Sequence, residues 1–274
     1  MSHLSNQCRG YTAIVLSAIG LMLAQGVSAQ EQTGRQILDE SHKRHTQSYE
    51  VESQKMTIYA NDVVTETREL RRLTRKMAEG ETRYLMNFNA PRGVRGVALL
   101  TWSFDKRDDD QWLYMPGDGR TKRIAKGGRR TAFMGTDFTY EDLITESRDK
   151  FKYDRLPDET VNGVPYFVVE AGATDPELVK ETGYKTRRLY LIKSNYFIAR
   201  IDYTDRRGEL FKRQTMSDIS NVQGQAWRAN TARMENLRDK TATVITVLNR
   251  NFSESSVPER FFLERFLTAQ EHMK

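Results

Sequence analysis

The feature that most constrains the fold is a long succession of short segments that alternate between apolar and polar residues, each followed by a turn. Tyr84, Met86 and Phe88 alternate with polar residues, a period-two pattern that gives a strand one apolar and one polar face. Turn sequences such as Asn162-Gly163 separate the segments. The other segments with this texture are 50–60, 63–77, 94–104, 111–115, 166–171, 185–192, 196–203, 209–217, 226–236 and 241–249.

Ten or eleven strands joined by short turns predict an antiparallel meander, not alternating strand and helix units. A sheet of that size must curl or close, because a flat one would leave its edges and its apolar face uncovered. Short helices are expected over residues 34–47 and from Pro258 to residue 267, where Phe262 and Phe266 share a face. The sequence shows no repeat, low-complexity tract or linker, so residues 30–274 are interpreted as one mainly β domain of the α+β class.

The first 29 residues have the pattern of a cleavable signal peptide. Arg9 precedes an apolar run over residues 11–23, and Val27-Ser28-Ala29 offers a cleavage site. The run is shorter than the roughly 18 apolar residues that a membrane span needs, which disfavours an uncleaved anchor. Cys8, the single cysteine, lies before the run, so it cannot be the lipid-modified cysteine of a bacterial lipoprotein. We therefore expect a periplasmic protein that is not a lipoprotein.

The charge balance indicates the kind of partner. The formal net charge is +6, or +5 once Arg9 of the signal peptide is left out. A basic exported protein is expected to meet anionic lipid headgroups or acidic protein surfaces. Nucleic acid, the usual partner of basic patches, is not expected in that compartment.

The polar residues do not form a pattern that predicts catalysis. His42 and His45 could share a metal, but no carboxylate or thiolate stands near them, so solvated helix positions are the preferred interpretation. The run 108–110 (DDD) lacks the spacing of a calcium loop and is interpreted as a solvated hairpin turn. Glu141 and Asp142 are adjacent, so their side chains diverge and favour a helix start or salt bridges over acid–base work. We expect no catalytic residue, no metal and no cofactor.

Composition suggests that the curved sheet encloses a hollow. Hydrophobic residues make up 38% of the chain, some of them in the signal peptide, and charged residues make up 29%. Such a chain is short of material for a solid core, and large or open barrels often enclose cavities. For each single residue, ordinary packing against the helices is the alternative. The predicted cavity-lining residues are Met86, Phe88, Leu100, Trp102, Trp112, Tyr114, Phe133 and Phe138.

A basic run forms the strongest charge feature of the chain. It is interpreted either as a solvated loop between two strands or as a cationic rim that attracts phosphate headgroups or an acidic partner. Arginine suits the second interpretation because its planar fork can hold phosphate oxygens with two hydrogen bonds. The residues predicted for this headgroup or partner rim are Arg120, Lys122 and Arg123, followed by Lys126, Arg129 and Arg130.

Several segments together resemble a known family. They are 95–100 (RGVALL), 112–116 (WLYMP), 123–124 (RI), 133–137 (FMGTD) and 140–143 (YEDL), in this order and spacing. They resemble the outer-membrane lipoprotein-sorting (LolA-like) family, in the branch associated with RND/MMPL-type transporters. The resemblance implies an unclosed antiparallel β-barrel of about 10–11 strands with helices over its open mouth. It also implies an acyl chain carried in the hollow and no catalytic residues.

The preferred functional hypothesis is a periplasmic carrier for lipid or lipoprotein acyl chains, acting between an inner-membrane RND/MMPL-type transporter and the outer membrane. We expect it to work as a monomer. The alternative is a lipid-sensing or regulatory interaction module of the same fold that transports nothing. A lipid hydrolase is disfavoured because no histidine lies in the sheet region to serve as a base.

Overall fold

The structure is a computed structural model that describes residues 31–78, 80–144 and 148–273. The predicted signal peptide, residues 1–29 with Cys8, lies outside these residues. Gln32–Lys274 form one compact unit. Within the described part of the chain, no helix is both long and apolar enough to cross a membrane.

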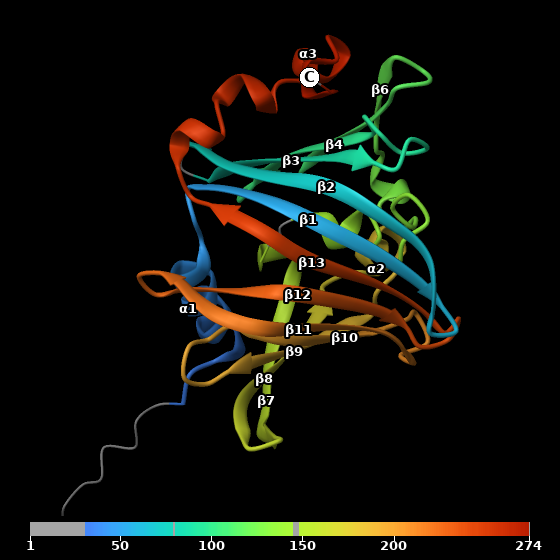
Figure 1. The fold of residues 1–274 in the computed structure, drawn as a ribbon. Coiled ribbons are helices and arrows are strands. Elements are labelled where there is room, and N and C mark those ends of the chain that lie inside the picture. The colour runs from blue at the N-terminus through green and yellow to red at the C-terminus, as the bar shows by residue number, and fades with distance from the viewer. Residues whose placement is uncertain (1–30, 79, 145–147, 274) are drawn as a thin grey trace, which may run out of the picture. The chain divides into compact units, whose positions relative to one another are not determined.

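The described residues contain thirteen strands, all in one antiparallel sheet (Figure 1). The order is β6-β5-β4-β3-β2-β1-β13-β12-β11-β10-β9-β8-β7, so β1 pairs with β13 and the first and last strands meet in the middle. The edges are β6 and β7, which do not pair with each other, so the barrel is unclosed. The strands are β1 Tyr49–Ala60, β2 Val63–Ala78, β3 Glu81–Ala90, β4 Ala98–Phe104, β5 Asp110–Met115, β6 Arg120–Arg123, β7 Phe151–Val161, β8 Val164–Ala173, β9 Thr186–Ile192, β10 Ile198–Thr204, β11 Leu210–Gln223, β12 Ala226–Asn236 and β13 Thr241–Asn251.

The antiparallel, unclosed architecture predicted from the alternation is confirmed, with two more strands than expected. The two that the sequence did not reveal are the edge strands. All four residues of β6 are polar (RTKR), and the second half of β7 (LPDETV) is largely polar and contains a proline. Edge strands commonly carry such residues, because charge and proline discourage pairing with other chains.

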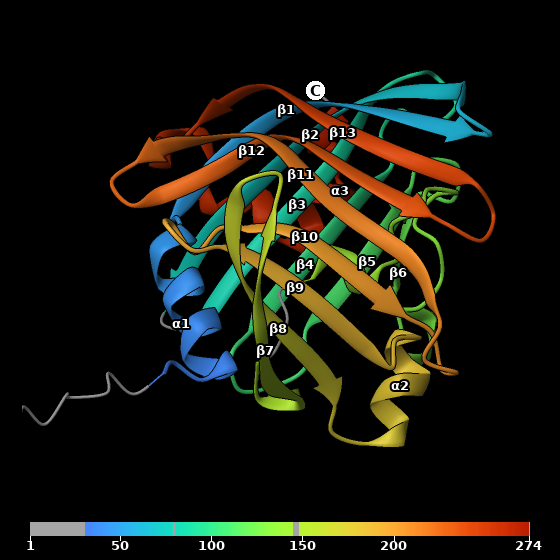
Figure 2. The ribbon, with the colours of Figure 1, turned by 90° about the horizontal axis from the view of Figure 1, so that it is seen from below.

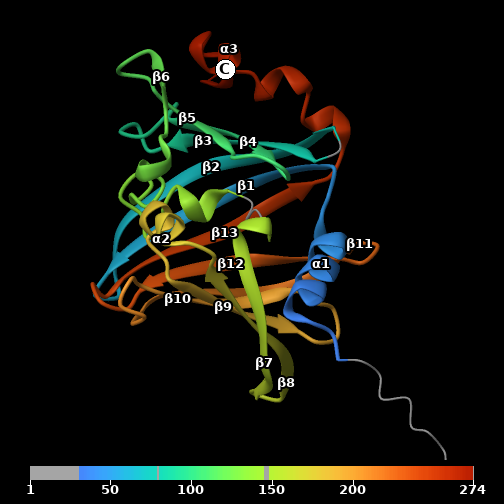
Figure 3. The same cartoon turned by 180° about the vertical axis from the view of Figure 1, so that it is seen from behind.

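Helices cover the hollow side of the sheet. The helices α1 (Gly34–His45) and α2 (Pro176–Thr182) lie there, with the connection from β6 to β7 between them (Figure 3). Ile37 and Leu38 of α1 pack in one cluster with Leu189 of β9. The predicted N-terminal helix is therefore confirmed. In the view from below, the β7–β8 hairpin stands in front of the curved sheet (Figure 2).

The β6–β7 connection, hereafter the inner segment (residues 124–144), enters the hollow. It includes the single 3-10 turns η1 (Lys126–Gly128) and η2 (Glu141–Leu143), and η3 (Arg148–Lys150) precedes β7. Phe133 of this segment stacks on Phe88 of β3 with ring centroids 5.8 Å apart. Met56, Leu70 and Met86 from the sheet join the same cluster. Part of the hollow is therefore filled by the chain's own side chains.

The C-terminal segment packs on the outer face of the sheet, beside β3 and β4 (Figure 1). The helix predicted from Pro258 is interrupted at Leu263, which divides it into η5 (Glu259–Phe262) and α3 (Glu264–Thr268). Phe262 and Phe266 pack in a cluster with Leu100 and Tyr114. The shorter 3-10 turns η4 (Glu254–Ser256) and η6 (Glu271–Met273) flank these elements.

Candidate functional site

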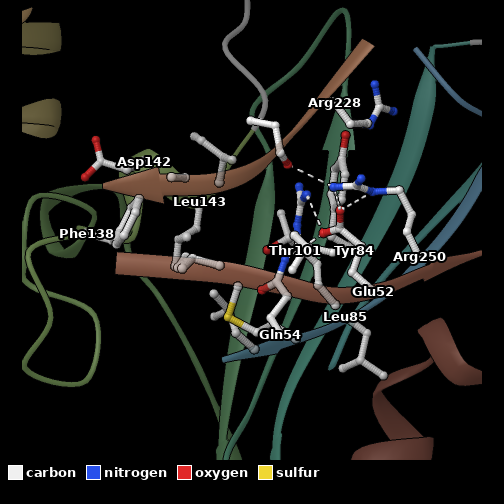
Figure 4. Close-up of a pocket in the computed structure, with 18 of the residues that line it drawn as sticks. Glu52, Gln54, Tyr84, Leu85, Thr101, Phe138, Asp142, Leu143, Arg228 and Arg250 are labelled. Atoms are coloured by element: carbon white, nitrogen blue, oxygen red, sulfur yellow. Dashed lines mark hydrogen bonds and ion pairs between the residues drawn. The ribbon is translucent and has the colours of Figure 1, made fainter. Parts of the chain in front are cut away.

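A cavity of about 260 Å³ lies between the inner face of the sheet and the end of the inner segment (Figure 4). Strands from both halves of the sheet contribute to its wall. One side is apolar and the other is polar. The apolar side chains include Met86, Leu99, Phe138, Leu143, Ile245 and Val247. The polar side chains include Glu52, Gln54, Arg72, Arg228, Asn230 and Arg250.

The strand register explains why these residues face one another. Residues directly opposite on neighbouring strands point to the same face of a sheet. Arg72 of β2 is opposite both Glu52 of β1 and Met86 of β3. Glu52 in turn is opposite Arg250 of β13. Polar residues from three strands are thus gathered on the inner face.

The polar end of the cavity is a compact charge cluster. The Arg250 Nε atom lies 2.7 Å from Glu52 Oε1 and 3.1 Å from Glu50 Oε1. The Arg228 Nη2 atom lies 2.8 Å from Glu50 Oε2. The Arg72 Nη1 atom is more distant, 3.9 Å from Glu52 Oε2. Among the described residues of this cluster, three guanidinium groups therefore face two carboxylates, which leaves one positive charge in excess.

Two further cavities continue this space. A cavity of about 310 Å³ beside α1 shares Arg72, Tyr84 and Arg228 with the first. Another, of about 260 Å³, shares Asp142, Ile144 and Gln214 with it and is lined by apolar residues of α1, β9 and β10. The apolar residues of this third cavity are Leu38, Ile144, Leu189, Ile198, Ile201 and Tyr203. The hollow thus contains three adjoining cavities whose walls include both polar and apolar side chains.

Buried ion pairs hold the inner segment in the hollow. Asp142 pairs with Lys212 of β11 and accepts a hydrogen bond from the Tyr184 hydroxyl at 2.9 Å. Burial alone would raise the pKa of Asp142, but the Lys212 ammonium outweighs it and lowers that pKa. Glu141 pairs with Arg187 at 2.9 Å, and here burial dominates and raises the pKa of Glu141. The predicted salt-bridge role of this carboxylate pair is confirmed.

Both ring nitrogens of His45 are engaged in hydrogen bonds with backbone groups. The backbone N–H of Trp227 donates to His45 Nδ1 at 3.2 Å, so Nε2 carries the proton and donates to the Asn195 carbonyl at 3.1 Å. Burial, assisted by Arg228, lowers the pKa of His45, which agrees with a neutral ring. In the described residues, no group of three or more His, Cys, Asp or Glu side chains could hold a metal ion.

The acidic run at the β4–β5 turn is only partly solvated, so that prediction was wrong in part. Asp108 pairs with Lys126 and Lys150. Asp109 is buried and accepts a hydrogen bond from the Phe104 backbone N–H at 3.0 Å. Asp110 is also buried. These carboxylates fix the turn to the inner segment and to β6, which a reading of turn propensity alone does not capture.

The structure divides the predicted cavity-lining residues between the two faces of the sheet. Met86 and Phe138 line the cavity, and Phe88 and Phe133 belong to the packed cluster beside it. The other four lie in the outer cluster against the C-terminal segment, which corrects their predicted position. These four residues are Leu100, Trp102, Trp112 and Tyr114.

The register between β3 and β4 causes this division. Met86 is opposite Leu99, and Leu85 is opposite Leu100, so even-numbered residues of β3 share a face with odd-numbered residues of β4. The sequence prediction placed residues of equal parity on one face across the connection. A shift of one residue moves every side chain to the other face.

The first part of the basic run, Arg120–Arg123, forms strand β6 at the sheet edge, whereas Lys126, Arg129 and Arg130 lie in the connection that follows, as the loop interpretation expected. Arg120, Lys122 and Arg123 are all exposed. Arg120 and Lys122 are opposite Met115 and Leu113 of the inner face, whereas Arg123 pairs with Asp110. None of the three is among the described residues that line the cavity.

The arginines of the cavity were missed by sequence reasoning. Their signal is weak: Glu50, Glu52 and Gln54 alternate along β1, Arg72 is one of several basic residues of β2, and Arg228 and Arg250 lie on β12 and β13, far along the sequence. A polar alternation of this kind is ordinarily read as a solvent-facing side of a strand. Arg250 lies beside Glu52 because β1 pairs with β13, a pairing that no local sequence pattern indicates.

Known proteins share this architecture. A family model described as an uncharacterized protein matches residues 80–269. An outer membrane lipoprotein-sorting protein domain from Vibrio parahaemolyticus is 30% identical, with a TM-score of 0.79 over 86% of this chain and 98% of that one. No curated protein matches the sequence.

Two further solved structures share the fold. A DUF1329 family protein from Desulfovibrio piger is 23% identical, with a TM-score of 0.78 over 85% of this chain and 97% of that one. A LolA superfamily protein from Nitrosomonas europaea is 17% identical, with a TM-score of 0.67 over 86% of this chain and all of that one. The chain therefore belongs to the outer membrane lipoprotein-sorting family and has the unclosed β-barrel fold of the LolA superfamily.

Proposed function

We propose that the protein is a periplasmic carrier that binds the acyl chains of lipids or lipoproteins in the hollow of its sheet. The observation that carries the proposal is the series of adjoining cavities on the inner face of the sheet. Membership of the lipoprotein-sorting family supports it. Binding, not catalysis, is the proposed activity.

Burial of an acyl chain supplies enough free energy for this role. Each methylene removed from water contributes about 0.8 kcal/mol, so a sixteen-carbon chain could gain on the order of 10 kcal/mol before ordering costs. The apolar wall formed by Met86, Phe138 and Ile245 offers such a surface inside the hollow. Release then requires a step that removes part of this gain.

The wider role that we propose is transfer between an inner-membrane transporter of the RND/MMPL type and the outer membrane, by a monomer. Arg120 and Lys122 on the edge strand β6 are exposed, and such cations support contact with an anionic surface. Attraction of this kind between exposed charges weakens as salt is added.

A second candidate is a lipid-sensing or regulatory module of the same fold. The observation that favours it is the packing of the inner segment, where Phe133 and Tyr140 are buried among residues of the sheet. A sensor could change the position of such a segment when lipid enters, without moving the lipid between membranes.

Two experiments test these functions in sequence. Native mass spectrometry of the mature protein, purified from the periplasm without detergent, should reveal co-purified lipid. If no lipid is bound after purification, and none is bound after incubation of the protein with lipid vesicles, both functions are refuted. Transfer of labelled lipid from donor to acceptor vesicles then separates them, since a carrier accelerates transfer and a sensor leaves it at the rate without protein.

A further inference from the structure

We propose that the polar end of the cavity is a headgroup subsite for a phospholipid whose phosphate is followed by a hydrogen-bond donor, either an ammonium or a hydroxyl group. This inference rests on the proposed function and names the class of lipid that the hollow would take. Two neighbouring side chains of the cavity carry it, Arg72 for the phosphate and Gln54 for the donor.

The guanidinium group of Arg72 has few polar contacts with the described residues. Its side chain is 41% exposed and lines both the first cavity and the one beside α1. It forms a 3.9 Å ion pair with Glu52, and its Cζ atom lies 5.5 Å from the centroid of the Tyr84 ring. A guanidinium group binds phosphate oxygens through two parallel N–H donors, and this one makes no hydrogen bond to the described residues.

The other two arginines of the cluster, Arg228 and Arg250, donate hydrogen bonds to protein groups. Arg250 donates to Glu52 and to the Asn230 side chain, and Arg228 donates to Glu50 and to backbone carbonyls. In the part of the cluster that the structure describes, three guanidinium groups face two carboxylates, and Arg72 has the most distant ion pair, so we assign the excess positive charge to Arg72. A phosphate diester, which carries one negative charge, would balance the cluster.

Gln54 presents an acceptor beside this site. The residue is 5% exposed, and its Nε2 atom donates to Glu52 Oε2 at 2.6 Å. That bond fixes the orientation of the amide, since the reverse orientation would place two oxygens together. The Oε1 atom is buried and has no hydrogen-bond partner in the described part of the chain. A buried acceptor of this kind favours a ligand that donates a hydrogen bond.

The strands place the two groups side by side with the apolar wall. Glu52 is opposite Arg72, and Gln54 is the next residue of β1 on the same face. Met86 of the apolar wall is opposite Arg72 on the other side. A phospholipid headgroup at Arg72 would therefore let its tails enter along Met86 and the apolar wall.

The test measures lipid selectivity with one mixture. The full chain is incubated with vesicles that contain equal amounts of dioleoyl phosphatidylethanolamine, phosphatidylglycerol, phosphatidylcholine and dioleoylglycerol. The protein is then re-isolated, and the bound lipids are extracted and quantified. All four share their tails, whereas dioleoylglycerol lacks the phosphate and the quaternary ammonium of phosphatidylcholine cannot donate a hydrogen bond.

For the unchanged protein we expect phospholipids to be enriched about tenfold over dioleoylglycerol, because charged hydrogen bonds to phosphate are strong. Arg72→Gln should abolish that enrichment. Arg71→Gln is the matched control: it removes the same charge from the next residue of β2, which is exposed on the outer face, and should leave the enrichment intact.

Gln54→Met tests the second half of the site. The unchanged protein should prefer phosphatidylethanolamine and phosphatidylglycerol over phosphatidylcholine by about threefold or more, the effect of one hydrogen bond from a hydroxyl or an ammonium group to the amide oxygen. Gln54→Met should remove this preference while the enrichment over dioleoylglycerol remains. If this buried substitution prevents folding, the preference of the unchanged protein still decides the point.

The outcomes separate the subsite from the function. Equal binding of dioleoylglycerol and phospholipids, or enrichment that survives Arg72→Gln, overturns the phosphate assignment and leaves the acyl-chain carrier standing. Equal binding of phosphatidylcholine and the two donor lipids overturns the role of Gln54. Protein that retains no lipid at all overturns the carrier and the subsite together.

Discussion

Asp142 and Lys212 form an ion pair inside the hollow of the sheet, with side chains only 3% and 4% exposed. The Lys212 ammonium also donates to the Tyr184 hydroxyl at 2.7 Å, and the Thr139 backbone N–H donates to Asp142 at 2.7 Å. These contacts join the inner segment to β11, on the half of the sheet opposite Phe88. The inner segment is thus fixed to both halves of the sheet.

We predict that Lys212→Met lowers the free energy of unfolding by about 3–5 kcal/mol, because it leaves the Asp142 carboxylate buried without a counter-charge. Urea denaturation at neutral pH measures the change. Lys55→Met, at an exposed position of β1, is the control and should have little effect. The double variant Asp142→Asn, Lys212→Met should recover part of the loss. A single variant as stable as the control would show that the pair is not an important anchor.

We also predict that Ala232→Phe strongly reduces the lipid retained by the purified protein. Ala232 of β12 lines the cavity, and a phenyl ring there would occupy space that the acyl chain needs. Thr231→Phe places the same ring at the next position, which faces the opposite side of the strand, and should leave retention unchanged. Lipid quantified by mass spectrometry gives the comparison. Full retention in the Ala232 variant would place the acyl chain elsewhere.

The sequence predicted the fold well because alternation is a local signal. Eleven strand segments could be located, and each corresponds to a strand of the structure. The edge strands β6 and β7 escaped because their residues serve solubility at an exposed edge more than burial. Helix α2 was also missed, although Asp175 as N-cap, Pro176 at its start and Gly183 at its end are standard helix signals.

The site could be predicted only in part, because it depends on register. Alternation assigns residues of one strand to two faces, but it does not state which face of the next strand matches. Met86 was assigned to the hollow, and Trp102 was assigned there too, although it lies on the outer face beside Trp112. The charge cluster required the pairing of β1 with β13, from opposite ends of the chain. No local pattern contains that information.

We predict that the ion pairs of Asp108 in the β4–β5 turn make an acid-sensitive contribution to the free energy of unfolding. Hydrogen bonds from Lys126 and Lys150 lower the pKa of Asp108 from 3.8 to about 2. Because the folded-state pKa lies below the unfolded value, the contribution is present above pH 3.8 and is lost as the pH falls towards about 2. Partial exposure of these groups keeps the effect small.

Urea midpoints measured across this interval should therefore fall more steeply for the unchanged protein than for Asp108→Asn. Asp118→Asn, in the exposed β5–β6 turn, supplies the control and should follow the unchanged protein. Parallel curves for the unchanged protein and Asp108→Asn would contradict the assigned ion pairs.

The outer cluster should matter for stability and not for lipid selection. Phe262 is fully buried against the outer face, and its carbonyl accepts a hydrogen bond from Trp102 Nε1 at 3.0 Å. Phe262→Ala removes a large buried ring, so the free energy of unfolding should fall by about 3–5 kcal/mol. Phe261→Ala, at a partly buried neighbour, should cost less. Because the sheet separates this cluster from the cavity, the lipids bound by folded Phe262→Ala should match those of the unchanged protein. A folded variant with altered bound lipid would mean that the two faces are coupled through the sheet.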